Sequence, residues 1–147
     1  MKIIHNTDKA PAPVGPDNQA IQHGNILFVS GQIAIDPASG DLITRDIESE
    51  TRQVFKNIKA ILENAGIGFE NIIKASVFVA DMNLYSRINA VYAEYFDEAT
   101  APARELVEVA NLPKFVNIEI SVIAGFDFAQ PTSWAKQVDW AKPKSTS

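Results

Sequence analysis

The chain of 147 residues contains no cysteine and only two histidines. Without thiols, disulfides, iron–sulfur clusters, thiolate zinc sites and a catalytic cysteine are excluded. His5 lies near the terminus and His23 precedes a Gly-Asn pair. We interpret both as structural or exposed, because a metal site needs several converging ligands. There is also no phosphate loop and no GxGxxG motif, so the sequence predicts neither a metal nor a nucleotide cofactor.

The sequence also lacks an excess of positive charge and any long apolar run. Its formal net charge is −5 and its pI is about 5.0, which gives no net attraction to nucleic acid or to anionic membranes. Apolar runs such as 26–29 and 75–80 are far too short to cross a bilayer. The first residues have no signal-peptide hydrophobic region. We therefore expect a soluble cytoplasmic protein without a membrane or nucleic-acid partner.

The remaining composition is that of one globular domain. Hydrophobic residues make up 46% of the chain, and this length is enough for a single core. We predict one domain over residues 1–125 and a C-terminal extension over 126–147, which loses periodicity and is partly ordered. Its aromatic residues Phe126, Phe128, Trp134 and Trp140 are expected to pack on their own subunit. A neighbouring subunit and the mouth of a cleft are the alternatives.

Residues 46–65 carry the clearest helical pattern. Apolar side chains recur there every three or four residues, which predicts an amphipathic helix with one buried face. Asp46 is the expected N-cap, and Gly66 stands where a glycine often follows a helix.

The other expected elements complete an α+β pattern. A second helix is predicted at 84–98, between two segments that are rich in β-branched residues. Strands are predicted at 1–4, at 20–30 (two strands around a Gly-Asn turn), at 33–35, at 71–80, at 105–109 and at 117–124. This order predicts a mixed sheet with two helices packed on one face.

Two charged residues next to apolar strands are candidates for a site. Arg104 follows Pro-Ala and precedes an apolar strand. It is either an ordinary surface cation or a receptor for a carboxylate, to which its guanidinium can donate two parallel hydrogen bonds. Glu119 interrupts the strand at 117–124. It either faces solvent or lies in a cleft, where it could orient or deprotonate a water.

Several segments resemble the RidA (YjgF) family in that family's order and spacing, from about residue 10 to residue 125. They cover nearly the whole chain outside the extension. The segments are SGQI at 30–33, NIKAILENAG at 57–66, KASVFVADM at 74–82, INAVYAEYF at 88–96, APAR at 101–104, VEVANLP at 107–113 and IEISVIA at 118–124.

The resemblance implies a chorismate-mutase-like α+β fold that assembles as a homotrimer, with a ligand cleft at each subunit interface. It implies hydrolysis of enamine/imine intermediates such as 2-aminoacrylate to 2-keto acids and ammonia, without a cofactor. On this resemblance Arg104 anchors the substrate carboxylate and Glu119 activates the water. Gly31 and Asn89 border the cleft, and the backbone N–H of Leu106 contacts the carboxylate.

The sequence departs from the family pattern at three positions. Asp17 stands where deaminases of the family usually have a tyrosine, and an anion there would repel a substrate carboxylate or bind a substrate amino group. Leu106 replaces a frequent cysteine, which preserves the amide contact but removes thiol chemistry. Ser121 replaces a second acidic residue.

These departures keep other functions open. A trimer that binds 2-keto acids without turnover, or acts like a chaperone, is favoured by Asp17. A deaminase of a larger substrate such as 2-aminomuconate is a further alternative. Some members of the family are labelled ribonucleases, but the acidic pI and the absence of a basic stripe interleaved with aromatic residues argue against RNA.

Overall fold

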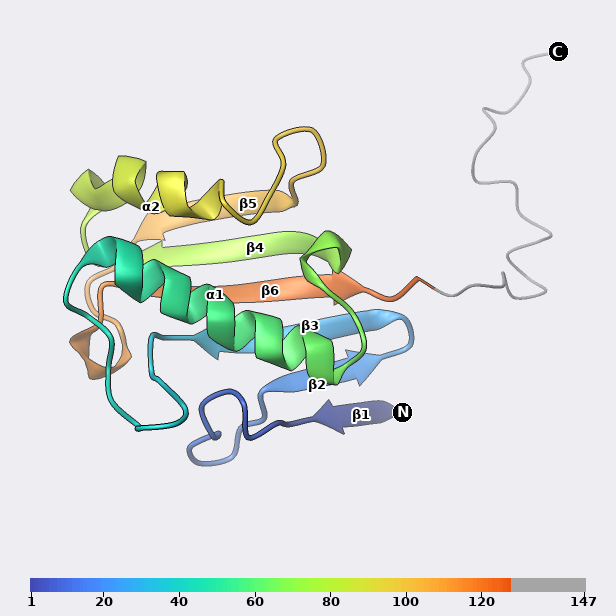
Figure 1. The fold of residues 1–147 in the computed structure, drawn as a ribbon. Helices are drawn as coiled ribbons and strands as arrows, with labels where there is room; N and C mark the ends of the chain where they lie inside the picture. Colours follow the sequence, from blue (N-terminus) through green and yellow to red (C-terminus); the bar gives the residue numbers. More distant parts are fainter. Residues whose placement is uncertain (128–147) are drawn as a thin grey trace, which may run out of the picture.

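A computed structural model describes residues 1–127, which form one six-stranded sheet with two α-helices on one face (Figure 1). The strand order is β1-β2-β3-β6-β4-β5, with β4 and β5 parallel and every other pair antiparallel. The predicted α+β class with a mixed sheet is confirmed. The strands are β1 (Lys2–His5), β2 (Ala20–His23), β3 (Ile26–Gln32), β4 (Ile72–Val79), β5 (Ala103–Glu108) and β6 (Ile118–Gly125). The α-helices are α1 (Ile47–Asn64) and α2 (Tyr85–Tyr92), and three short 3₁₀ helices are η1 (Phe69–Asn71), η2 (Met82–Leu84) and η3 (Pro113–Phe115).

Helix α1 begins and ends where the sequence predicts. The side chain of Asp46 accepts a hydrogen bond from the backbone N–H of Ser49 at 2.7 Å, which satisfies one of the N–H groups left free at a helix start. Gly66 follows the helix with φ of +81°, a conformation that strongly favours glycine. The apolar face of α1 packs on the sheet and contains side chains such as Phe55 and Ile58, both 0% exposed.

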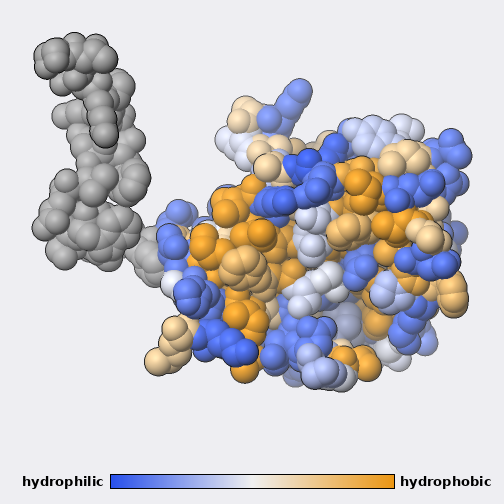
Figure 2. Space-filling view, turned by 180° about the vertical axis from the view of Figure 1, so that it is seen from behind, coloured by the Kyte–Doolittle hydropathy of each residue, from blue (hydrophilic) through white to orange (hydrophobic). Residues whose placement is uncertain are grey.

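Alternation along the strands separates a helix-covered face from an uncovered face of the sheet. In β6, Ile118 and Ile120 are 0% exposed beneath the helices, while Glu119 between them points to the other side. Cross-strand pairing aligns four apolar residues on the uncovered face: Ile4, Ile21, Phe28 and Ile123. Figure 2 views this face and shows hydrophobic side chains spread across it among polar ones. Exposed apolar side chains gathered on one face are a common feature of interaction surfaces.

Two expected elements differ from the structure. Residues 33–35 form no strand, and Ile35 makes one isolated bridge to Leu42. The cause is Asn57 of α1, whose buried amide donates to the carbonyls of Ile33 at 3.1 Å and Ile35 at 2.9 Å. These carbonyls are thereby satisfied by a side chain and not by a neighbouring strand.

Helix α2 ends at Tyr92, six residues before the predicted end at residue 98. The backbone tightens there, because the N–H of Tyr95 bonds to the carbonyl of Tyr92, three residues earlier. This turn brings the ring of Tyr95 into a stack with Phe55, with 4.4 Å between ring centroids. Tyr95 and Phe96, which lie within the predicted helix, therefore pack on Phe55 of α1 from a turn.

The predicted extension at 126–147 lies mostly outside the described residues. Phe126 packs against the core, whereas Phe128, Trp134 and Trp140 are beyond residue 127. Within the part of the chain that the structure describes, neither α-helix is long and apolar enough to cross a bilayer.

The start of β6 is fixed by a buried carboxylate. Glu50 of α1 is 0% exposed, and its Oε2 accepts hydrogen bonds from the backbone N–H groups of Asn117 (2.7 Å) and Ile118 (3.2 Å). Its Oε1 accepts from the side-chain amide of Asn117 at 2.7 Å. Three donors thus converge on one carboxylate, and they position the residues that immediately precede Glu119.

We predict that Glu50→Gln destabilises the fold by about 1–3 kcal/mol, because one acceptor oxygen becomes an NH₂ donor that faces other donors. Urea denaturation measures the loss. Glu63→Gln, on the exposed side of the same helix, is the matched control and changes the midpoint little. Equal midpoints for the two variants would contradict the structural role of Glu50.

Candidate functional site

Arg104 is held against helix α2 at the edge of the sheet. It lies in β5, and its side chain points to the helix-covered face. Its Nη1 donates to Oδ1 of Asn89 at 2.8 Å, and its Nη2 donates to the hydroxyl of Tyr85 at 3.2 Å. The centre of the guanidinium lies 4.5 Å from the ring centroid of Tyr92, within cation–π range. These contacts fix the orientation of a half-buried cation.

Arg104 differs from the other arginines in having no carboxylate partner within residues 1–127. Each of the other three pairs with an acid: Arg45 with Asp46, Arg52 with Glu94 and Arg87 with Glu48. A guanidinium has five N–H donors, and Arg104 uses two of them in these contacts. Three donors therefore remain for a ligand.

The ring of Tyr92 packs against the guanidinium of Arg104. Tyr92 is 7% exposed, and within the described chain its hydroxyl has no hydrogen-bond partner. Burial raises the pKa of Tyr92, while the charge of Arg104 acts in the opposite direction. The ring packs on Phe55 and Phe96, with centroid distances of 5.8 and 4.6 Å. Above it lies a hollow of about 780 Å³, the Arg104 hollow, lined by Asn89, Tyr92, Ala93, Phe96, Asp97, Glu98, Ala101, Pro102 and Arg104.

The backbone of Leu106 adds a donor at the same edge. The N–H of Val109 bonds to the carbonyl of Val79 in β4. Because N–H groups alternate between the two sides of a strand, the N–H of Leu106 points away from β4. Strand β5 ends the sheet, so this N–H faces the open edge beyond Arg104. The side chain of Leu106 packs against the core.

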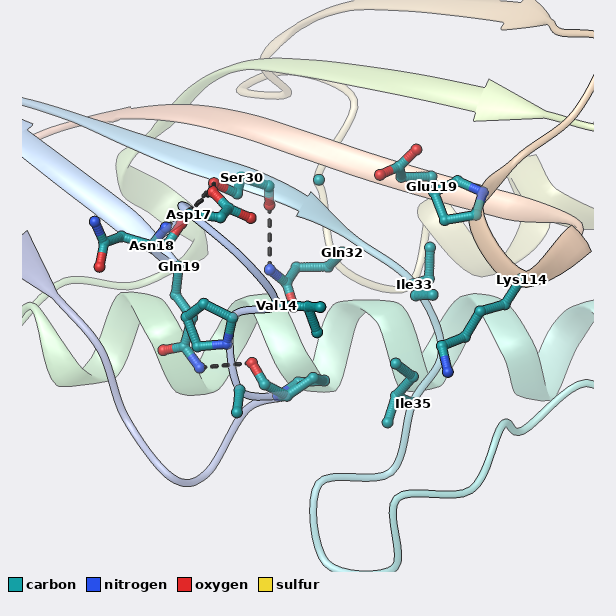
Figure 3. A pocket seen from close by; sticks show the side chains of 15 residues that line it. Val14, Asp17, Asn18, Gln19, Ser30, Gln32, Ile33, Ile35, Lys114 and Glu119 are labelled. Atoms are coloured by element: carbon teal, nitrogen blue, oxygen red, sulfur yellow. Dashed lines mark hydrogen bonds between the residues drawn. The ribbon is translucent and has the colours of Figure 1, made fainter.

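A second group of predicted site residues lies at the end of β3. Asp17, Gly31 and Glu119 line a cavity of about 400 Å³, the β3 cavity (Figure 3). Its other walls are Pro11, Ala12, Pro13, Val14, Asn18, Gln19, Ser30, Gln32, Ile33, Ile35, Pro113 and Lys114. One chain thus lines this open cavity with two carboxylates, of which Asp17 is exposed and Glu119 is half-buried.

The carboxylate of Glu119 lies close to Gly31. A Cβ added at Gly31 would lie 2.9 Å from Cδ of Glu119, a contact that forces the carboxylate to move. Burial raises the pKa of Glu119 above its ordinary value of 4.5, which brings it nearer to the range useful for a general base at neutral pH. Gly31 therefore makes room for a desolvated carboxylate.

Backbone strain adjoins the β3 cavity. Lys114, which lines it, and Phe115 have φ of +54° and +53°, in the left-handed region that costs roughly 1–2 kcal/mol for a non-glycine residue. Phe115 is 83% exposed. Strain of this kind persists where surrounding structure imposes it, often near functional sites.

The structure brings the predicted residues together in two groups and keeps the groups apart. Arg104, Asn89 and the N–H of Leu106 belong to the helix-covered face and the β5 edge. Glu119 projects from the uncovered face close to Gly31, and it lines the same cavity as Asp17. Strands β4 and β6 separate β5 from β3 in the sheet. Within one subunit, Arg104 and Glu119 therefore cannot act on the same small molecule.

Sequence reasoning assigned no site role to Tyr85, Tyr92, Ser30 or Lys114. A signal for the tyrosines is present, since residues 85, 89 and 92 fall on one side of a helix. Ser30 and Lys114 come from a strand end and a short 3₁₀ helix, where no periodicity indicates the direction of a side chain.

Comparison with known proteins identifies the family. The sequence profile of the family "Endoribonuclease L-PSP" matches residues 7–126. The chain belongs to the RidA family. A RutC family protein of Pyrococcus horikoshii is 53% identical over 124 residues, which cover 84% of this chain and 98% of that protein. The 2-iminobutanoate/2-iminopropanoate deaminase of Salmonella typhimurium is 46% identical over 120 residues, which cover 80% and 93%.

Solved structures of RidA-family proteins have the same fold. Escherichia coli TdcF, solved with bound serine, matches with a TM-score of 0.80 and 40% identity, over 85% of this chain and 99% of that one. The Escherichia coli YjgF gene product matches with a TM-score of 0.78 and 43% identity, over 84% and 98%. The resemblance in fold and family expected from the sequence is confirmed.

We predict that Glu119→Gln stabilises the fold at pH 7 and that the gain disappears near pH 4. A carboxyl whose folded-state pKa is raised favours folding below its unfolded pKa, and that contribution is lost as the pH rises through the folded-state pKa. Glutamine does not ionise, so the variant does not lose this stabilisation as the pH rises. Urea denaturation at equal protein concentration and both pH values measures it. Glu70→Gln, which changes an exposed carboxylate, controls for charge, and a gain that persists at pH 4 would contradict the desolvation of Glu119.

Proposed function

We propose that this protein hydrolyses enamine/imine intermediates of the 2-aminoacrylate type to 2-keto acids and ammonia, with Arg104 as the anchor of the substrate carboxylate. The supporting observation is the unpaired, oriented guanidinium of Arg104, held by Asn89 and Tyr92. A hydrogen bond to a charged group contributes about 1.5–3 kcal/mol, enough to dominate recognition of a small acid. The imine-deaminase name of the Salmonella relative and the serine bound to TdcF agree with a ligand that carries a carboxylate.

Glu119 would act on water in this reaction. The imine R–C(=NH)–COO⁻ adds water at the imine carbon, where a C–O bond forms as Glu119 accepts a proton from the water. Glu119 returns this proton to the nitrogen. The hydroxyl of the adduct then gives its proton to the nitrogen by way of the same carboxylate as the C–N bond breaks, and R–C(=O)–COO⁻ and ammonia leave. A positioned base supplies about 10²–10⁴-fold, and the raised pKa of Glu119 suits this task. Gly31 leaves space for the carboxylate, and the N–H of Leu106 would donate to the substrate beside Arg104.

The active site would form between copies of the chain, in a homotrimer. Arg104 and Glu119 come from opposite faces of one sheet, so a ligand that meets both must lie between two subunits. Two further features support assembly: the apolar row across the uncovered face and the unpaired edge of β5. Cyclic assembly would place the Arg104 hollow of each subunit against the β3 cavity of the next.

We predict that Arg104→Ala lowers kcat/KM for 2-aminoacrylate by roughly 100-fold or more, because the carboxylate anchor is lost. The substrate is generated enzymatically, and pyruvate release is measured against the spontaneous rate. Arg45→Ala, which removes a solvent-exposed arginine outside both cavities, serves as the matched control with wild-type activity. Wild-type release no faster than the spontaneous rate would refute the deaminase function.

Subunit mixing tests whether the site is shared. Arg104→Ala and Glu119→Gln subunits are each expected to be inactive, but random mixed trimers should recover about a quarter of wild-type activity. The reason is that an interface works when one subunit supplies Arg104 and its neighbour supplies Glu119. Each variant refolded with itself is the control. If mixing restores nothing although mass spectrometry shows mixed trimers, the shared site is wrong.

A second candidate is a trimer that binds 2-keto acids without turnover, or acts like a chaperone. Asp17 favours it, since a carboxylate in the β3 cavity replaces the tyrosine expected from the family resemblance. Calorimetric binding of 2-ketobutyrate that is lost in Arg104→Ala, together with no turnover of any imine, would select this alternative. Turnover of 2-aminomuconate in preference to 2-aminoacrylate would select the deaminase of a larger substrate.

A further inference from the structure

Two carboxylates line the β3 cavity, and Lys114, the one cation among its described lining residues, forms no ion pair with either of them. They are Asp17 and Glu119, and within residues 1–127 neither forms an ion pair. Lys114 lies on the far side of the cavity from Asp17, and its side chain runs toward Ile35 (Figure 3). The end of the cavity near Asp17 is therefore negatively charged.

Asp17 is held in a fixed orientation. Its backbone N–H donates to the carbonyl of Gly15 at 2.9 Å, across a turn in which Gly15 has φ of +74°. Oδ1 accepts from the backbone N–H of Asn18 at 2.8 Å. The hydroxyl of Ser30, which bonds to the carbonyl of Asn18 at 2.7 Å, lies 3.3 Å from the same Oδ1. Oδ2 accepts no hydrogen bond from the described residues.

The carboxylate of Asp17 thus has an acceptor oxygen to offer to a ligand. A substrate whose imine carbon reaches Glu119 would have room for its side chain in the β3 cavity, whose lining includes Asp17 at the other end (Figure 3). An anionic side chain there is repelled, a neutral one leaves the charge uncompensated, and a cationic one is attracted.

We propose that the site selects 2-imino acids whose side chain carries a second, positively charged group. This inference rests on the proposed deaminase function and deepens it. The ligand would be bipolar, with its carboxylate on Arg104 of one subunit and its cation on Asp17 of the next. Water adds at the imine carbon, the C–N bond breaks and ammonia leaves, while the side-chain cation is unchanged. The supplying reaction is an oxidation of the α-amine of a basic amino acid to its imine.

A matched pair of substrates tests the charge selection. An amino-acid oxidase converts L-arginine and L-citrulline into imines of nearly equal shape, of which only the first is cationic. Competition with semicarbazide reports how fast the protein removes each imine. We expect kcat/KM to be at least tenfold higher for the arginine-derived imine, and the ratio to fall to near one in Asp17→Asn. Asp8→Asn, a change at an exposed aspartate outside the cavity, should keep the wild-type ratio.

The outcomes separate this inference from the proposed function. If 2-aminoacrylate is hydrolysed in an Arg104-dependent manner but the arginine-to-citrulline ratio is near one, the charge selection is wrong and the deaminase stands. If no imine is hydrolysed, calorimetry with the two corresponding 2-keto acids decides. A tenfold tighter binding of the guanidino acid, lost in Asp17→Asn, upholds charge selection in a binding protein, and equal binding overturns it.

Discussion

The guanidinium of Arg104 lies over the ring of Tyr92 and bonds to Asn89, and the proposed chemistry depends on this arrangement. The other three arginines each pair with a carboxylate of the described chain. Here an aromatic face and an amide oxygen stabilise the charge without neutralising it. The remaining donors keep their capacity for a ligand carboxylate. In the proposed function, the buried aromatic cluster of α1 and α2 would have a second role, as the floor of the recognition site.

The same sheet that orients Arg104 keeps it away from Glu119. Strand residues alternate in direction, so the two side chains point to opposite faces and cannot form an internal ion pair. Such a pair would use the donors needed for substrate and would lower the pKa of Glu119. The fold of one subunit thus preserves two reactive groups by separating them. Only a second copy, placed against the uncovered face, can bring an arginine and a glutamate to one ligand.

Much of the fold follows from local sequence. The spacing of apolar residues and the Asp46 and Gly66 caps predict α1 closely, and alternation predicts β6. The errors have tertiary causes. Asn57 takes the carbonyls that a strand at 33–35 would need, and stacking of Tyr95 on Phe55 ends α2 early. Neither interaction is visible in a short window of sequence, because each joins segments far apart in the chain.

The sequence singles out candidate site residues, but it does not give their arrangement. Family motifs single out Arg104, Glu119 and Gly31, yet nothing in their spacing reveals that they lie on two faces. The tight approach of Gly31 to Glu119 is likewise a cross-strand property. Tyr92 has an apolar neighbourhood in sequence, and its role beneath Arg104 depends on how α2 packs over β5.

Assembly would also link substrate binding to the basicity of Glu119. When a neighbouring Arg104 approaches the β3 cavity, its charge favours the ionised form of Glu119 and makes it a weaker base. A substrate carboxylate bound to Arg104 neutralises that cation and excludes water, so the pKa of Glu119 rises again at the moment when a water must be deprotonated.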